Sequence, residues 1–208
     1  DVYGIAYDMN GQVNTDLLHP LGDQDGKLSA VYQYTQGFSD MVAAIESHEA
    51  SAVRNKMKNL PADQVGDFIT SLSFGGLYMH GTHVAGIAVR DNPFARVLVA
   101  RIAFDYHVTP QAMTMEIAQA HAASYAATAK YFRDHGVRVV NMSWGWTFKE
   151  IEGSLEANGV GETAEERAEM AREMIGVLKE GLYQAMVDSP DILFVTAAGN
   201  DDNDVEFD

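Results

Sequence analysis

Residues 80–86, His-Gly-Thr-His-Val-Ala-Gly, carry the side chain best suited to acid–base chemistry. A histidine changes its charge near neutral pH, which makes it the most common general base. Gly81 and Gly86 would allow the backbone to pack closely, and Thr82 would cap a helix that begins at the next residue. A buried helix start with two incidental histidines fits the same residues, so the spacing alone leaves both interpretations open.

Metal binding explains these histidines less well. The helical zinc motif places two histidines at i and i+4 with a glutamate between them, whereas His80 and His83 stand at i and i+3 with Gly and Thr between. Asp8, Asp23 and Asp25 carry the oxygen ligands that calcium prefers. Their spacing matches no calcium loop, so a solvated acidic loop is the preferred interpretation. We therefore predict no metal and no cofactor, with calcium as the alternative that these aspartates leave open.

Three segments in the right order resemble the subtilisin-like serine proteases, or subtilases. Residues 80–86 resemble the histidine block of that family. Residues 139–145, Val-Val-Asn-Met-Ser-Trp-Gly, resemble its substrate-binding strand, and residues 194–200, Phe-Val-Thr-Ala-Ala-Gly-Asn, resemble the strand that ends in the oxyanion-hole asparagine. The resemblance implies an α/β fold of three layers, a mostly parallel sheet flanked by helices. It also implies a serine endopeptidase with a Ser-His-Asp triad.

The resemblance assigns a role to each matching residue. His80 would be the general base, and the side-chain amide of Asn200 would stabilise the oxyanion. Ser143, Trp144 and Gly145 would bind an extended peptide substrate by strand addition. Without the resemblance, Asn200 would be interpreted as a turn residue, and the Ser-Trp-Gly segment as a strand end with a buried tryptophan.

The nucleophile of the triad is not found in the sequence. The family places it in a Gly-Thr-Ser-x-Ala-x-Pro segment, and no serine here has that context. Ser143 belongs to the substrate strand, and Ser189 precedes a proline. We therefore predict that residues 1–208 are a partial catalytic domain, inactive alone, which needs further N- and C-terminal segments of the same protease.

The triad carboxylate is also expected outside these residues. Asp8 follows the apolar and aromatic segment 1–7, where a subtilase could place this aspartate. However, Thr-Gly or Ser-Gly normally follows that aspartate, and here Met-Asn-Gly follows. Residues 1–4 instead resemble a segment that many bacterial subtilases have after the catalytic aspartate. Asp8 remains the alternative candidate for the triad carboxylate.

Composition limits the possible partners. The 208 residues suit one domain, with 47% hydrophobic and 21% charged residues. The net charge of −16 repels phosphate backbones, which argues against nucleic-acid binding. No apolar run approaches the roughly 20 residues of a membrane span, and the absence of cysteine excludes disulfides and a cysteine nucleophile. No signal peptide is recognised. Since subtilases are usually exported, the resemblance implies a secreted, periplasmic or cell-envelope protein.

Hydrophobic periodicity and turn residues predict the elements that position these segments. A helical insertion is expected over about 39–73 and a second over about 149–188. Strands and helices alternate after Val97, which indicates a parallel sheet flanked by helices. In chain order, we expect a strand over 1–7, a loop over 10–38, helices over 39–58 and 65–72, a strand over 94–102, a helix from Thr109-Pro110 to Gly136, a strand over 137–142, a helix over 163–188 and a strand over 192–196.

Two other functional hypotheses remain. A pseudoprotease or interaction module would keep the fold and lack the nucleophile. An unrelated acidic α/β binding domain would require all three matches to be chance. Because a partial domain leaves sheet edges open, we also expect the isolated chain to fold poorly or to associate with itself or with the missing segments.

Overall fold

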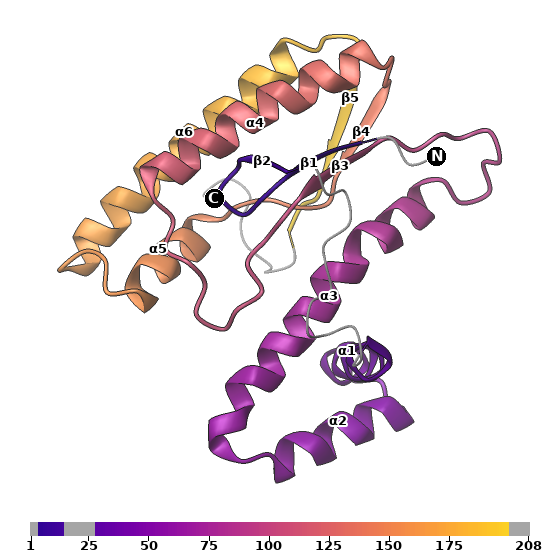
Figure 1. Ribbon diagram of the computed structural model, residues 1–208, viewed down its shortest axis with the longest axis vertical. Helices are drawn as coiled ribbons and strands as arrows, with labels where there is room; N and C mark the ends of the chain where they lie inside the picture. The colour runs from indigo at the N-terminus through magenta and orange to yellow at the C-terminus, as the bar shows by residue number, and fades with distance from the viewer. Residues whose placement is uncertain (1–3, 15–27, 200–208) are drawn as a thin grey trace. The chain divides into compact units, whose positions relative to one another are not determined.

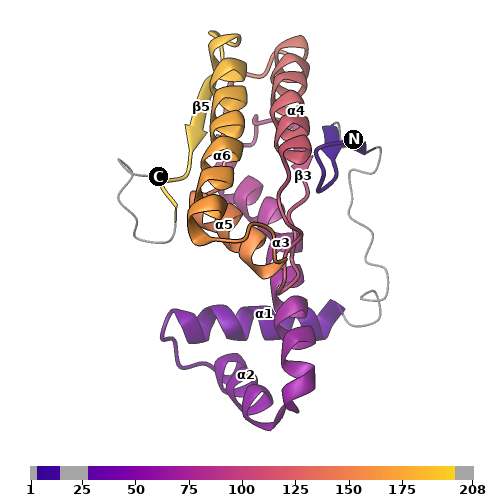
Figure 2. The same cartoon turned by 90° about the vertical axis from the view of Figure 1, so that its left-hand side faces the viewer.

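The computed structural model describes residues 4–14 and 28–199, which form two compact units that are considered separately (Figures 1 and 2). Among these residues, the first unit comprises 4–14, 88–105 and 109–199, and the second comprises 28–87 and 106–108. The elements in chain order are β1 (Gly4–Tyr7), β2 (Val13–Asn14), α1 (Leu28–Val42), α2 (His48–Asn59), a 3₁₀ turn (Ala62–Gln64), α3 (Val65–Ala88), β3 (Val99–Ile102), α4 (Met115–Asp134), β4 (Val139–Met142), α5 (Phe148–Ala157), α6 (Ala164–Val187) and β5 (Leu193–Thr196).

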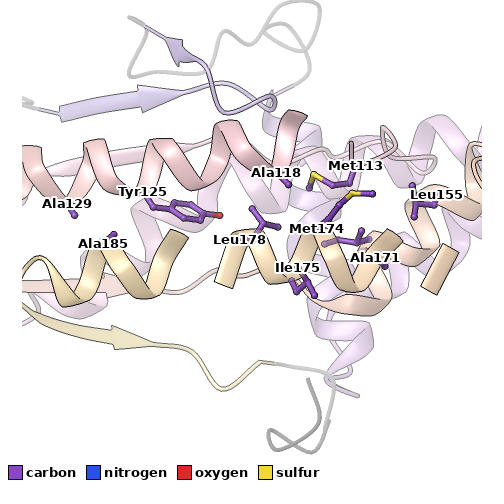
Figure 3. Packing of buried hydrophobic residues seen from close by; sticks show 11 residues of the cluster. Met113, Ala118, Tyr125, Ala129, Leu155, Ala171, Met174, Ile175, Leu178 and Ala185 are labelled. Atoms are coloured by element: carbon purple, nitrogen blue, oxygen red, sulfur yellow. The ribbon is translucent and has the colours of Figure 1, made fainter. Parts of the chain in front are cut away.

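The core of the first unit lies between α4 and α6, which run side by side, with α5 packed on α6 (Figure 2). Small residues allow the two long helices to approach closely: Ala129 of α4 faces Ala185 of α6 (Figure 3). A Cβ added to Gly181 of α6 would lie 2.5 Å from the Cβ of Ala122 of α4. The buried residues of this cluster are Met113, Ala118, Tyr125, Ala129, Ile151, Leu155, Ala171, Met174, Ile175, Leu178 and Ala185.

The strands of the first unit form two small sheets. β1 pairs in parallel with β3 and antiparallel with β2. β4 pairs in parallel with β5, with Met142 opposite Thr196. Together with the helices, these parallel pairs confirm an α/β fold, consistent with an incomplete subtilisin-like architecture. Val139, Leu193 and Val195 of the β4–β5 sheet remain exposed.

Helix ends in the first unit follow from local hydrogen bonds. Thr163 is the N-cap of α6, as the sequence predicts, and its side chain accepts a hydrogen bond from the Glu166 amide. Gly136 follows α4 with a φ of +69°, a conformation that glycine adopts without strain. The segment predicted as a second helical insertion forms two helices, α5 and α6. Thr147 and Glu150 form a capping box at the start of α5.

Two element boundaries in the first unit differ from the prediction. Helix α4 begins at Met115 instead of Thr109, because Thr114 caps it and accepts from the Ile117 amide. Strand β3 begins at Val99 instead of residue 94. The first residues of the predicted strand belong to a turn, which the hydrogen bond from the Ala95 amide to the Asn92 carbonyl closes.

The second unit corrects the predicted loop over 10–38. Residues 15–27 lie outside the described residues, but α1 begins at Leu28, within that loop. Gly37 is inside α1, where an added Cβ would lie 2.3 Å from the Glu49 carbonyl oxygen of α2. The glycine therefore serves close helix packing and not a turn. The predicted helix over 39–58 is broken, because Ser47 caps α2 and its hydroxyl also donates to Asp40 over 2.6 Å.

Helix α3 is far longer than the short helix predicted over 65–72. It continues without interruption to Ala88 and contains the histidine block. The prediction that a helix begins after Thr82 is therefore wrong, since the residues before it are already helical. No proline separates Leu72 from Thr82, and the helix continues through Ser73 and the Gly75-Gly76 pair. Among the helices described, none is long and apolar enough to cross a bilayer.

Candidate active site

The carboxyl ends of β4 and β5 bring two of the predicted site segments to one sheet edge. The strands are parallel, and past their last pair the Ala197 amide donates to the Met142 carbonyl over 3.1 Å. Ser143 follows β4 at this edge, and residues 197–199 follow β5 beside it. Ligands of α/β proteins bind at such carboxyl ends. Asn200, the predicted oxyanion donor, lies outside the described residues.

The predicted substrate segment, Ser143 to Gly145, leaves β4 without regular structure and is partly accessible. Ser143 is half-buried, and its Oγ accepts a hydrogen bond from the Asn141 side-chain amide over 2.9 Å. Gly145 is exposed, and an added Cβ would meet no atom within 4 Å. Packing among the described residues therefore does not require a glycine here. A ligand backbone that approaches the segment closely would require one.

Aromatic side chains flank Gly145 on both sides. The ring of Trp144 lies 5.5 Å from that of Tyr125 and 6.3 Å from that of Phe104, measured between centroids. The ring of Trp146 lies 5.4 Å from Phe104 and 5.4 Å from His121. These separations are typical of favourable aromatic pairs. The cluster therefore holds both tryptophans against the body of the first unit.

Tyr125 provides a polar contact in this cluster. Its hydroxyl accepts a hydrogen bond from Trp146 Nε1 over 3.1 Å. Burial raises the pKa of Tyr125 to about 12, although the hydrogen bond from Trp146 acts in the opposite direction. The phenol is therefore neutral at physiological pH.

His121 is a buried histidine that the sequence analysis did not select. It is only 1% exposed, and its Nε2 donates to the Met9 carbonyl over 3.1 Å. Among the described residues, its Nδ1 has no hydrogen-bond partner. Burial lowers the pKa of His121 below its usual value, opposed by the Met9 hydrogen bond and the charge of Asp8. A neutral imidazole therefore joins α4 to the turn after β1.

The histidine block lies in the second unit, on the exposed part of α3. His80, Thr82 and His83 are exposed. A Cβ added to Gly81 or Gly86 would meet no atom within 4 Å, so the predicted close packing of these glycines is not seen among the described residues. Since His80 and the Ser143 segment belong to different units, their convergence in one cleft remains a prediction.

The two other candidate residues have local partners. Asp8 Oδ1 accepts from the amides of Asn10 and Gln12, each over 2.9 Å, and so closes the turn between β1 and β2. Ser189 is buried, donates to the Ala185 carbonyl and accepts from Arg133. Both side chains thus stabilise the fold. Asp23 and Asp25 lie outside the described residues, and the described part of the chain contains no cluster of three His, Asp or Glu suited to a metal ion.

The sequence contained a signal for His121, which was missed as a candidate. His121 stands three positions after Ala118 and four before Tyr125, so on a helix it shares the face of these two apolar residues. A histidine on such a face is either buried or functional. Trp146 adjoins the predicted substrate segment and was a candidate wall of a substrate pocket, but its contacts with Tyr125 and Phe104 could not be predicted because those residues are distant in sequence.

A comparison with protein-family models finds a match to the model described as the Subtilase family over residues 69–207. This range covers roughly two thirds of the chain and includes the histidine block and both strand segments. Comparisons with curated proteins and with solved structures find no match.

Proposed function

The chain belongs to the subtilase family, and from that membership we propose that it is part of a subtilisin-type serine endopeptidase. The family is one of serine peptidases, so the substrate class is a peptide or protein. The proposal assigns His80 as general base, Asn200 as oxyanion donor, and Ser143, Trp144 and Gly145 as the substrate-binding segment.

The proposed reaction is acyl transfer through a serine nucleophile. The serine attacks the scissile carbonyl, His80 takes its proton and later returns it to the leaving amine, and a carboxylate orients the imidazole. The Asn200 amide would stabilise the oxyanion, and the loss of such a donor in subtilisin lowers kcat about 10²–10³-fold. In this proposal, sequence outside residues 1–208 supplies the serine and the aspartate.

The observation that carries the proposal is the parallel pairing of β4 with β5. The Ala197–Met142 hydrogen bond holds the chain leading toward Asn200 beside the start of the Ser143 segment. A peptide on that segment would present its scissile carbonyl near the same sheet edge. The open space at Gly145 supports a close approach of the substrate backbone.

Labelling with a fluorophosphonate, which reacts with base-activated serines, tests this proposal. The complete gene product should be labelled, and the His80→Ala variant should lose labelling, since each triad member is needed to activate the serine. A His83→Ala variant is the matched control, because His83 is an exposed neighbour on the same helix. It should retain most of the labelling.

Absence of labelling in a folded complete product would refute the endopeptidase and favour the pseudoprotease. Labelling that survives in His80→Ala would refute the role of His80. Export to the cell envelope or medium, as for many bacterial subtilases, is part of the same proposal, and cell fractionation tests it.

A further inference from the structure

The Trp-Gly-Trp sequence at 144–146 joins two well-ordered elements. β4 ends at Met142, and α5 begins directly after its N-cap residue, Thr147. The segment between them has no regular secondary structure. The conformation of this segment therefore depends on the side chains that attach it to the rest of the first unit.

Tyr125 is well placed to be that anchor. It is 5% exposed and belongs to the core cluster, with its ring directed into the layer between α4 and α6 (Figure 3). Its hydroxyl accepts the Trp146 indole N–H, and its ring contacts Trp144. Trp146 is half-buried, and an indole N–H that is partly removed from water gains from an acceptor within the protein. One core side chain thus holds the residues on both sides of Gly145.

We propose that Tyr125 is a positioning residue for substrate binding, whose hydroxyl fixes the Ser143–Gly145 segment through Trp146. This inference rests on the proposed function, and it adds a residue on α4 that acts through another side chain and does not touch the substrate. A segment already fixed in its binding conformation loses less entropy when an extended peptide binds.

The Tyr125→Phe variant tests the inference, because it keeps the ring and removes the acceptor. In the complete gene product, we expect KM for an extended peptide to rise about three- to tenfold with kcat nearly unchanged, which is the effect of one lost hydrogen bond on uniform binding. The rate of fluorophosphonate labelling should not change, since that small probe does not need the segment. A purely structural role would lower the labelled fraction and leave KM unchanged.

Two further variants complete the design. Tyr183→Phe is the matched control, because Tyr183 is 59% exposed on α6, and it should leave KM unchanged. Trp146→Phe removes the donor of the same hydrogen bond, so its effect on KM should not add to that of Tyr125→Phe in the double variant. Additive effects would contradict the mechanism.

The outcomes separate this inference from the proposed function. Turnover by the wild type with an unchanged KM in Tyr125→Phe would refute the inference alone. No turnover and no labelling by the wild type would refute both the proposed function and this role of Tyr125.

Discussion

Helices α3 and α6 are both 24 residues long, but they are buried in different ways. α6 has buried residues from Ala171 to Ala185, spread over its length. The buried residues of α3 all lie in its first half, from Phe68 to Gly75. Its second half carries the histidine block and has no buried residue.

The comparison shows that apolar residues in a helix do not always form a buried face. In α6 the apolar residues recur on one face, and that face packs against α4 within the same unit. In the second half of α3, Leu77 and Ile87 are apolar but remain 42% and 60% exposed. The histidine block, one of the three segments that resemble the family, thus lies on a half of α3 that has no buried residue.

Substitution of one leucine in each helix measures this difference. Leu178→Ala in α6 removes a side chain that is 3% exposed and should lower the free energy of unfolding by about 2–5 kcal/mol. Leu77→Ala in α3 should cost less than about 1 kcal/mol, because that side chain already contacts water. Denaturant unfolding of the complete gene product compares the two. Equal losses would mean that Leu77 is buried in the folded protein.

Two glycines of α6 allow a packed and an open position to be compared within a single helix. Gly181→Ala should destabilise the protein by about 1–3 kcal/mol, because the added Cβ would clash with Ala122 of α4. Gly176→Ala should instead stabilise it by about 0.5–1 kcal/mol, since that Cβ meets no atom of residues 4–14 and 28–199 within 4 Å and alanine favours a helix. Thermal unfolding measures both. A stabilising Gly181→Ala would contradict the close packing of α4 on α6.

The sequence predicted best those elements whose ends are set by nearby residues. Thr163 and Gly136 mark helix ends through their own side chain or backbone conformation, and both predictions are confirmed. The start of α4 was placed too early, because Thr109-Pro110 and Thr114 offer competing starts and only Thr114 makes the hydrogen bond. Gly37 was interpreted as a loop residue, since its contact with α2 depends on a neighbour that the local sequence does not reveal.

The candidate site was predictable only in part. The motifs identified the family and the segments at the ends of β4 and β5. They did not reveal Tyr125 and His121, because these residues act through Trp146 and Met9, which are far from them in the sequence. The position of His80 relative to Ser143 is likewise a property of tertiary packing, which no local pattern encodes.

The smallest expected effect is a pH dependence that His121 confers on the first unit. Burial holds the pKa of folded His121 below its usual value near 6.5. As pH falls below 6.5, the unfolded chain binds a proton at this residue that the folded protein resists, so the free energy of unfolding decreases. Above 6.5 both states are neutral there, and the effect disappears. The charge of Asp8 opposes the shift and limits its size.

The His121→Gln variant isolates this contribution, because glutamine can still donate to the Met9 carbonyl but does not titrate. The loss of unfolding free energy between pH 7.5 and pH 5, conditions chosen on either side of the usual histidine value, should be smaller in this variant than in the wild type. His135→Gln, at the exposed end of the same helix, controls for the replacement of one histidine of this segment by glutamine. An equal loss in wild type and His121→Gln would show that His121 is not kept neutral by burial. The acid sensitivity of the first unit would then arise from other groups.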